Sequence, residues 1–235
     1  MAKKTETESI DTNEVKASKR ITLSQYGEAT YEVKKSVFLG YAKPVSSPEE
    51  ANAFVDEIKH KNADARHNVY AWILKKEINL QKYSDDGEPS GTAGLPVLSV
   101  LTKNEITDAV VVVTRYFGGI LLGKGGLVRA YTRAAAEAVK NAMPVTMELC
   151  VIYGIEVDYK NSERLLFEIR NSGRRITNIE YGANVSFEVI VPVQDAQAFC
   201  DFVFDTSAGK IEPFKIDEVE AMGEDFRIEI DEQEE

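Results

Sequence analysis

The sequence predicts an α+β protein made of two domains. Residues 147–222 alternate in the order βαββαβ, which is the order of a split βαβ sandwich, or ferredoxin-like fold. Residues 109–141 read as a strand, a glycine-rich loop and a helix, so strands and helices also alternate in the first half. The charge changes between the halves: residues 1–146 hold 20 Lys and Arg against 18 Asp and Glu, and residues 147–235 hold 8 against 21. We therefore place the domain boundary near residues 143–147.

Composition limits the classes of protein that fit. Hydrophobic residues make up 43% of the 235 residues, enough to offset the entropy of ordering the chain, which excludes disorder throughout. The net charge of −11 opposes attraction of the whole surface to nucleic acid or anionic lipid. The N-terminus lacks the apolar core of a secretory signal, and the most apolar run, Ala109–Val113, is too short to span a membrane. We therefore expect a cytoplasmic protein.

Residues 1–20 are polar and are expected to form a flexible arm ahead of an N-terminal domain at residues 21–143. Ser47, Pro48 and the two glutamates that follow predict a helix start, because they supply an N-cap, a proline at the first helical position and first-turn acids. Apolar periodicity and turn residues predict the other elements: strands at 21–33, 37–43, 68–74 and 109–114, a loop at 82–94, and helices at 95–101 and 127–141.

The C-terminal domain is expected at residues 147–222, followed by an acidic tail at 223–235. Its strands are predicted at 149–159, 175–181, 185–191 and 210–219, and its helices at 162–171 and 195–204. Gly182 and Asn184 lie in a predicted hairpin turn. Cys150 and Cys200 are too few for a disulfide framework or a structural zinc site, so we expect buried, reduced thiols.

The glycine-rich segment after the strand at 109–114 is a candidate anion site. A strand, a glycine-rich loop and a helix in this order direct free backbone N–H groups at an anion. Gly118 to Lys124 spells G-x-x-x-x-G-K, the start of a nucleotide-binding P-loop. Gly125 stands where a Ser or Thr should bind magnesium, which disfavours ATP or GTP. A general anion site and a tight connection made possible by glycine both remain open.

Basic residues gather around this segment. Arg129 and Arg133 are four residues apart, hence on one helix face, and aromatic residues lie close by in the sequence. The 28 residues between Asp108 and Glu137 contain no carboxylate. We expect one positive groove that binds nucleic acid or another anion, although two exposed arginines on a solvated face would give the same pattern. The candidate residues are Arg115, Tyr116, Gly118, Gly119, Lys124, Gly125, Gly126, Arg129 and Arg133.

Asp85, Asp86 and Glu88 form an acidic loop next to Ser90 and Thr92. A turn with side chain-to-backbone hydrogen bonds explains such a cluster, and acid–base chemistry is the alternative. A calcium loop of the EF-hand type is disfavoured, because the twelfth position from Asp85 is Pro96. His67 opens a predicted strand, where a histidine is either a structural residue or a base.

Four motifs, in this order, resemble the IMPACT/YigZ family. They are KKSVFLGY from Lys34, RHNVYA from Arg66, YSDDGEPSGTAG from Tyr83, and VTRYFGG from Val113 with its continuation through Arg129-Ala130-Tyr131. The resemblance covers residues 21–141, and residues 147–219 resemble the small C-terminal domain of bacterial members. It implies an N-terminal domain like the second domain of a small-subunit ribosomal protein, and a ferredoxin-like C-terminal domain like one in elongation factor G.

The resemblance also bears on function. Eukaryotic members act in translational control by blocking activation of a starvation-responsive initiation-factor kinase, whereas bacterial members have been proposed to bind nucleic acid or ribosomes. The family supplies no established catalytic residues. We therefore expect a non-enzymatic, stress-related regulator of translation that binds RNA or ribosome-associated proteins, with no catalytic residue, cofactor, metal or membrane. The alternatives are a hydrolase or peptidase that uses the acidic loop and His67, and a module that binds only proteins.

Overall fold

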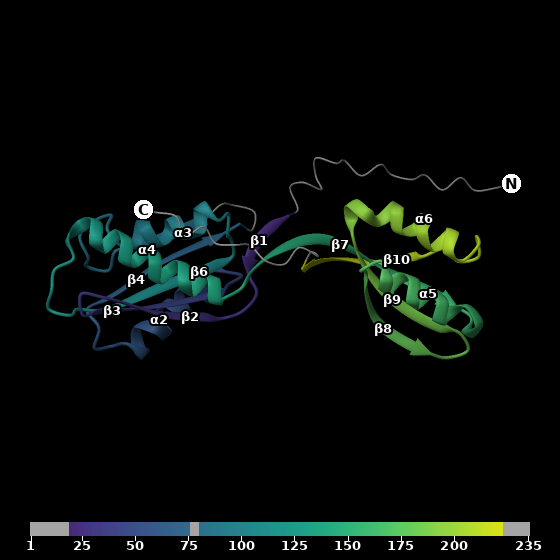
Figure 1. The fold of residues 1–235 in the computed structure, drawn as a ribbon, viewed down its shortest axis with the longest axis horizontal. Coiled ribbons are helices and arrows are strands. Elements are labelled where there is room, and N and C mark those ends of the chain that lie inside the picture. The colour runs from purple at the N-terminus through teal and green to yellow at the C-terminus, as the bar shows by residue number, and fades with distance from the viewer. Residues whose placement is uncertain (1–18, 76–79, 223–235) are drawn as a thin grey trace. The chain divides into compact units, whose positions relative to one another are not determined.

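The computed structural model of the chain describes residues 19–75 and 80–222. These residues fall into two compact units, Arg20–Thr146 and residues 147–222 together with Lys19. The change of unit falls within a strand, β7 (Pro144–Val157) (Figure 1). The polar arm and the acidic tail predicted at the two ends lie outside the described residues, apart from Lys19 and Arg20. That each unit folds on its own stays a prediction.

The N-terminal unit is built on a five-stranded antiparallel sheet. The strands are β2 (Gly27–Val33), β3 (Ser36–Pro44), β4 (His67–Leu74), β5 (Leu80–Ser84) and β6 (Ala109–Tyr116), in the spatial order β2-β3-β6-β4-β5. The short strand β1 (Arg20–Leu23) precedes them, and its Ile21 forms an isolated bridge with Ile106. β6 lies in the centre, as its run of four valines predicts for a strand covered on both faces.

Helices cover both faces of this sheet (Figure 1). One core lies beneath α3 (Gly94–Lys103) and α4 (Gly123–Asn141), and a second lies beneath α2 (Pro48–Lys61). α4 approaches the sheet closely, because a Cβ added at Gly40 would lie 2.3 Å from the Ala134 carbonyl oxygen. The small residues along α4 therefore let the helix lie this close to the sheet.

α2 begins as predicted. Ser47 is its N-cap, and the Ser47 hydroxyl accepts a hydrogen bond from the Glu50 N–H at 3.2 Å. Other predicted boundaries are wrong. The single strand predicted at 21–33 is divided at residues 24–26 into β1 and β2. Residues 82–84 belong to β5, an exposed edge strand without apolar alternation, and not to a loop. α4 begins at Gly123, not at Leu127, so Lys124, Gly125 and Gly126 occupy its first turn and lie outside the loop.

The C-terminal unit has the predicted ferredoxin-like topology. β7, α5 (Tyr159–Asn171), β8 (Arg175–Tyr181), β9 (Val185–Pro192), α6 (Ala196–Thr206) and β10 (Phe214–Met222) follow one another, with the 3-10 turn Val193–Asp195 before α6. The strands lie in the order β10-β7-β9-β8, and every pair is antiparallel. Alternate residues of β9 pack against α5 and α6 around Phe187 and Phe199. In the described part of the chain, no helix is long and apolar enough to cross a membrane.

Candidate nucleic-acid interface

Arg115, the first residue of the predicted groove, is buried in an ion pair. Its Nη1 lies 2.6 Å from Oε1 of Glu88, and the Tyr131 hydroxyl donates to the same oxygen at 2.8 Å. Burial, together with the Glu88 carboxylate, raises the pKa of the Tyr131 hydroxyl far above its usual range, so it stays protonated as a donor. Only 7% of Arg115 is exposed. The prediction that Arg115 lines an open positive groove is therefore wrong.

The acidic loop is a structural connection. The Asp85 carboxylate accepts hydrogen bonds from the N–H groups of Gly91, Ala93 and Gly94 at 2.8–3.0 Å, and so caps the N-terminus of α3. Asp86 Oδ2 accepts from the Asn68 N–H at 2.7 Å, which ties the loop to β4. These contacts match the interpretation of the cluster as a hydrogen-bonded turn. Among the described residues, no group of His, Cys, Asp and Glu could hold a metal ion.

His67 belongs to the same hydrogen-bonded turn. Its Nδ1 lies 2.8 Å from the Asp86 carbonyl oxygen, which orients the ring, and the Thr92 hydroxyl donates to the Pro89 carbonyl oxygen at 2.6 Å. Ser90 is exposed. Cys150 is buried, and burial raises the pKa of its thiol. Within residues 19–75 and 80–222, no hydrogen bond joins His67 to the hydroxyl of Ser90 or Thr92, the contact that a nucleophile and its general base would make.

The glycine-rich loop after β6 makes a close connection to the turn between β2 and β3. The Gly118 N–H donates to the Ser36 hydroxyl at 3.1 Å, and a Cβ added at Gly118 would lie 2.0 Å from the Lys35 carbonyl carbon. Gly119 and Gly123 have φ angles of +85° and +72°, which side chains with a Cβ rarely adopt. Glycine is thus required here for packing and turn geometry.

We expect no magnesium-dependent binding of ATP or GTP. The Gly118 N–H is already bonded to the Ser36 hydroxyl, and Gly125, in the place of a Ser or Thr, supplies no hydroxyl for the metal. Isothermal titration calorimetry with each nucleotide and magnesium should show no saturable heat. Micromolar affinity that disappears in Lys124→Ala would contradict this expectation.

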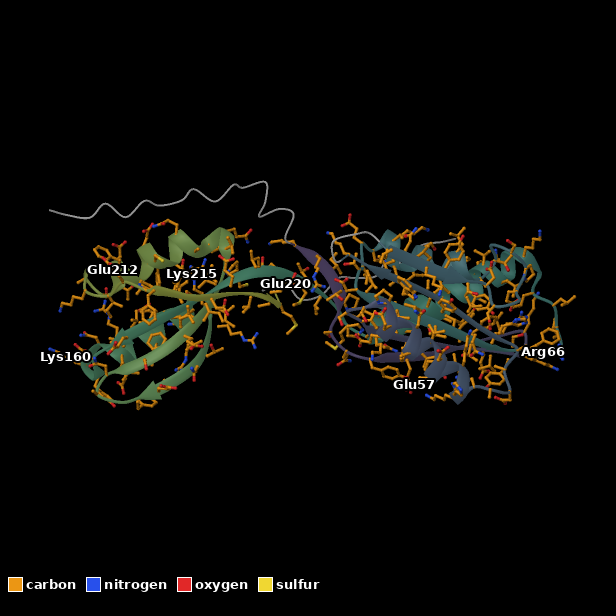
Figure 2. The ribbon with its side chains drawn as sticks, turned by 180° about the vertical axis from the view of Figure 1, so that it is seen from behind. Glu57, Arg66, Lys160, Glu212, Lys215 and Glu220 are labelled. Atoms are coloured by element: carbon orange, nitrogen blue, oxygen red, sulfur yellow. The ribbon has the colours of Figure 1, made fainter. Side chains whose placement is uncertain are left out.

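Exposed basic residues gather at the end of the sheet where β6 finishes. Arg115 and Tyr116 pair in register with Phe38 and Val37 of β3, and Arg115 also pairs with His67 of β4. The residues just outside those strands therefore share this end, and Figure 2 shows Arg66 there. α4 starts at the same end, because its Tyr131 ring packs edge-on against Phe38 at 5.1 Å. We call Lys34, Lys35, Arg66, Lys124 and Arg129 the basic end.

The side chains of the basic end are open to solvent and lie together at one end of the unit. All five are exposed, and none forms an ion pair within the described part of the chain. Arg133, also predicted for this surface, is engaged with Glu137 at 2.9 Å and lies over the Tyr31 ring. Tyr116 donates its hydroxyl hydrogen to Asp64 at 2.9 Å. Two predicted cations, Lys124 and Arg129, thus lie on an open surface. The other three cations of this surface, Lys34, Lys35 and Arg66, are not among the residues predicted from the sequence.

Comparison with known proteins identifies the family. The sequence model of the Impact N-terminal domain matches residues 34–139, and that of a domain of unknown function, DUF1949, matches residues 155–210. IMPACT family member YvyE of Bacillus subtilis is 38% identical over 189 residues, which cover 80% of this chain and 87% of the relative. The chain belongs to the IMPACT family. The predicted resemblance is confirmed.

Other members of the IMPACT family agree with this assignment. IMPACT family member YigZ of Escherichia coli is 33% identical over 189 residues, covering 80% of this chain and 93% of the relative. A hypothetical protein with a solved crystal structure has 30% sequence identity to this chain. The two superpose with a TM-score of 0.53 over 85% of this chain and 98% of the other. The two-domain α+β architecture is therefore shared with a solved structure.

Proposed function

We propose that this member of the IMPACT family is a non-enzymatic regulator of translation that binds RNA, free or within the ribosome, through the basic end. The observation that carries the proposal is the group of five exposed cations without an ion pair at one end of the N-terminal unit. The role in translation is proposed from the resemblance to the IMPACT family, because eukaryotic members of that family act in translational control.

Charge balance supports this surface as an RNA contact. Residues 20–146 hold 16 Lys and Arg against 14 Asp and Glu, so the N-terminal unit is close to neutral in a strongly acidic chain. The carboxylates of the neighbouring loop are engaged: Glu88 with Arg115, and Asp85 with backbone N–H groups. Glu32 and Asp64 are exposed at the same end, but the five cations outnumber them. Flexible, exposed Lys and Arg side chains are the groups that contact phosphates.

The hydrolase alternative has less support. Its candidate acids already have structural partners: Asp85 and Asp86 accept backbone hydrogen bonds that hold α3 and β4, and Glu88 is paired with Arg115. A module that binds only proteins keeps one observation in its favour, since Leu121 in the loop before α4 is 82% exposed. The two binding functions differ in their dependence on salt, because RNA contacts release counterions.

The test is a filter-binding titration of the full chain with ribosomal RNA and with purified ribosomes. We expect binding at about 50 mM salt, with an affinity that falls linearly on a log–log plot as salt rises. Binding without this salt dependence would point to an apolar protein contact on the ribosome. If neither RNA nor ribosomes bind at low salt, RNA binding is wrong, and the protein-only module takes its place.

A further inference from the structure

One aromatic side chain, Phe117, projects from the surface beside the basic end. It directly follows β6, and 51% of it is exposed. Ile120 and Leu121 extend the exposed apolar surface of the same loop. An exposed aromatic ring next to unpaired cations is the combination found where proteins bind single-stranded nucleic acid.

The Phe117 ring is held in place by contacts with the buried Arg115 side chain and by the attachment of its neighbour Gly118. The Arg115 guanidinium carbon lies 5.5 Å from the centroid of the Phe117 ring and 5.5 Å from the centroid of the buried Phe38 ring. Arg115 itself is fixed by its ion pair with Glu88. The next residue, Gly118, is attached to Ser36 by a hydrogen bond. The Phe117 ring is thus ordered before any ligand arrives, so stacking on it costs little further side-chain entropy.

Cations come from two segments that adjoin the Phe117 loop. Gly118 packs on the backbone of Lys35 in the turn between β2 and β3, and Lys124 and Arg129 occupy the first two turns of α4 after the loop. A base stacked on Phe117 would therefore have its own phosphate and those of its neighbours within reach of these side chains. Tyr116 offers less of a platform, since its side chain is only partly exposed.

We infer that the basic end takes single-stranded RNA, with one unpaired base stacked on the Phe117 ring; this rests on the proposed function. Bases inside a duplex are already stacked on their neighbours and expose no free face to an aromatic side chain. Duplex RNA can still reach the cations through its phosphates. Phe117 therefore adds affinity for single strands and none for duplexes, so the ring discriminates between the two forms.

The experiment compares two labelled RNAs on the full chain, an oligouridylate of about 12 nucleotides and a duplex of similar length. In Phe117→Ala, fluorescence anisotropy should show about tenfold weaker binding of the oligouridylate, the loss typical of one stacked base. Binding of the duplex should be unchanged. Phe117→Tyr should keep the wild-type preference, because tyrosine has the same ring. Phe117→Leu should lose it while keeping apolar bulk over Arg115.

Tyr26→Ala is the matched control. Tyr26 is similarly exposed but lies next to the first residue of β2, at the opposite end of the sheet from Lys34. The Tyr26→Ala variant should bind the oligouridylate and the duplex with the same affinities as the wild type. Equal weakening of both RNAs in Phe117→Ala and Phe117→Leu, or no change in either, would overturn the inference. Binding of the duplex without the oligouridylate would overturn it and leave the proposed function standing, whereas failure of both RNAs to bind would overturn the proposed function as well.

Discussion

Replacing Glu88 by alanine is expected to lower the free energy of unfolding by about 3–5 kcal/mol, the cost typical of breaking a buried ion pair at one partner. The change leaves the Arg115 guanidinium buried without its carboxylate, and it removes the acceptor of the Tyr131 hydroxyl. Arg115 already has one buried nitrogen, Nε, without a hydrogen-bond partner. Urea unfolding followed by circular dichroism would measure the loss.

An exposed ion pair provides the control. Arg133 and Glu137 form a salt bridge on the surface of α4, and Glu137→Ala should cost less than about 1 kcal/mol because solvent screens such pairs. Replacing both buried partners, with Glu88→Leu and Arg115→Met together, should recover much of the stability that Glu88→Ala removes, since no charge is then buried alone. A loss for Glu88→Ala as small as that for Glu137→Ala would show that the buried pair is not important for stability.

Glu88 connects stability to the proposed function. It fixes Arg115, and the Arg115 guanidinium supports the Phe117 ring. The doubly substituted protein, although folded, lacks the cation beneath Phe117. Its binding of single-stranded RNA should therefore fall between those of the wild type and Phe117→Ala.

The second large effect is expected from removing four cations of the basic end. Lys34, Lys35, Lys124 and Arg129 changed together to alanine should weaken binding of ribosomal RNA by roughly a thousandfold, since each cation bound to a phosphate contributes on the order of 1 kcal/mol. The slope of log affinity against log salt should fall by about one unit for each phosphate that the variant no longer neutralises. All four side chains are exposed and outside the cores, so the melting temperature should change little.

A charge-matched variant separates local contacts from net charge. Lys43, Lys75, Lys103 and Lys140 lie near the ends of β3, β4, α3 and α4, at the opposite end of the N-terminal unit. Changing these four lysines to alanine alters the net charge equally and should weaken binding only slightly, through long-range attraction. Equal losses in the two variants would mean that the RNA responds to net charge alone, and the basic end would not be the contact surface.

Sequence patterns predicted those helices and strands that are determined by residues close together in the chain. The α2 start depends on Ser47 and Glu50, three residues apart. β6 and β9 follow from a buried valine run and from strict alternation. β5 was missed because an edge strand with exposed side chains carries no such pattern, and it forms by pairing with β4. The α4 start was missed because glycines in its first turn resemble loop residues.

The sequence by itself determined the two α+β units, the ferredoxin-like order of the second and the family, because these depend on periodicity and on motifs of adjacent residues. Only the tertiary structure decided which charged side chains are exposed to a ligand and which are buried in ion pairs. Arg115 lies 27 residues from Glu88, and Tyr131 lies 43 residues from it, yet all three meet in one buried cluster. Lys34 and Arg66 join the open surface through strand register. Burial and pairing between residues distant in the chain are set by packing, which no local pattern of charge records.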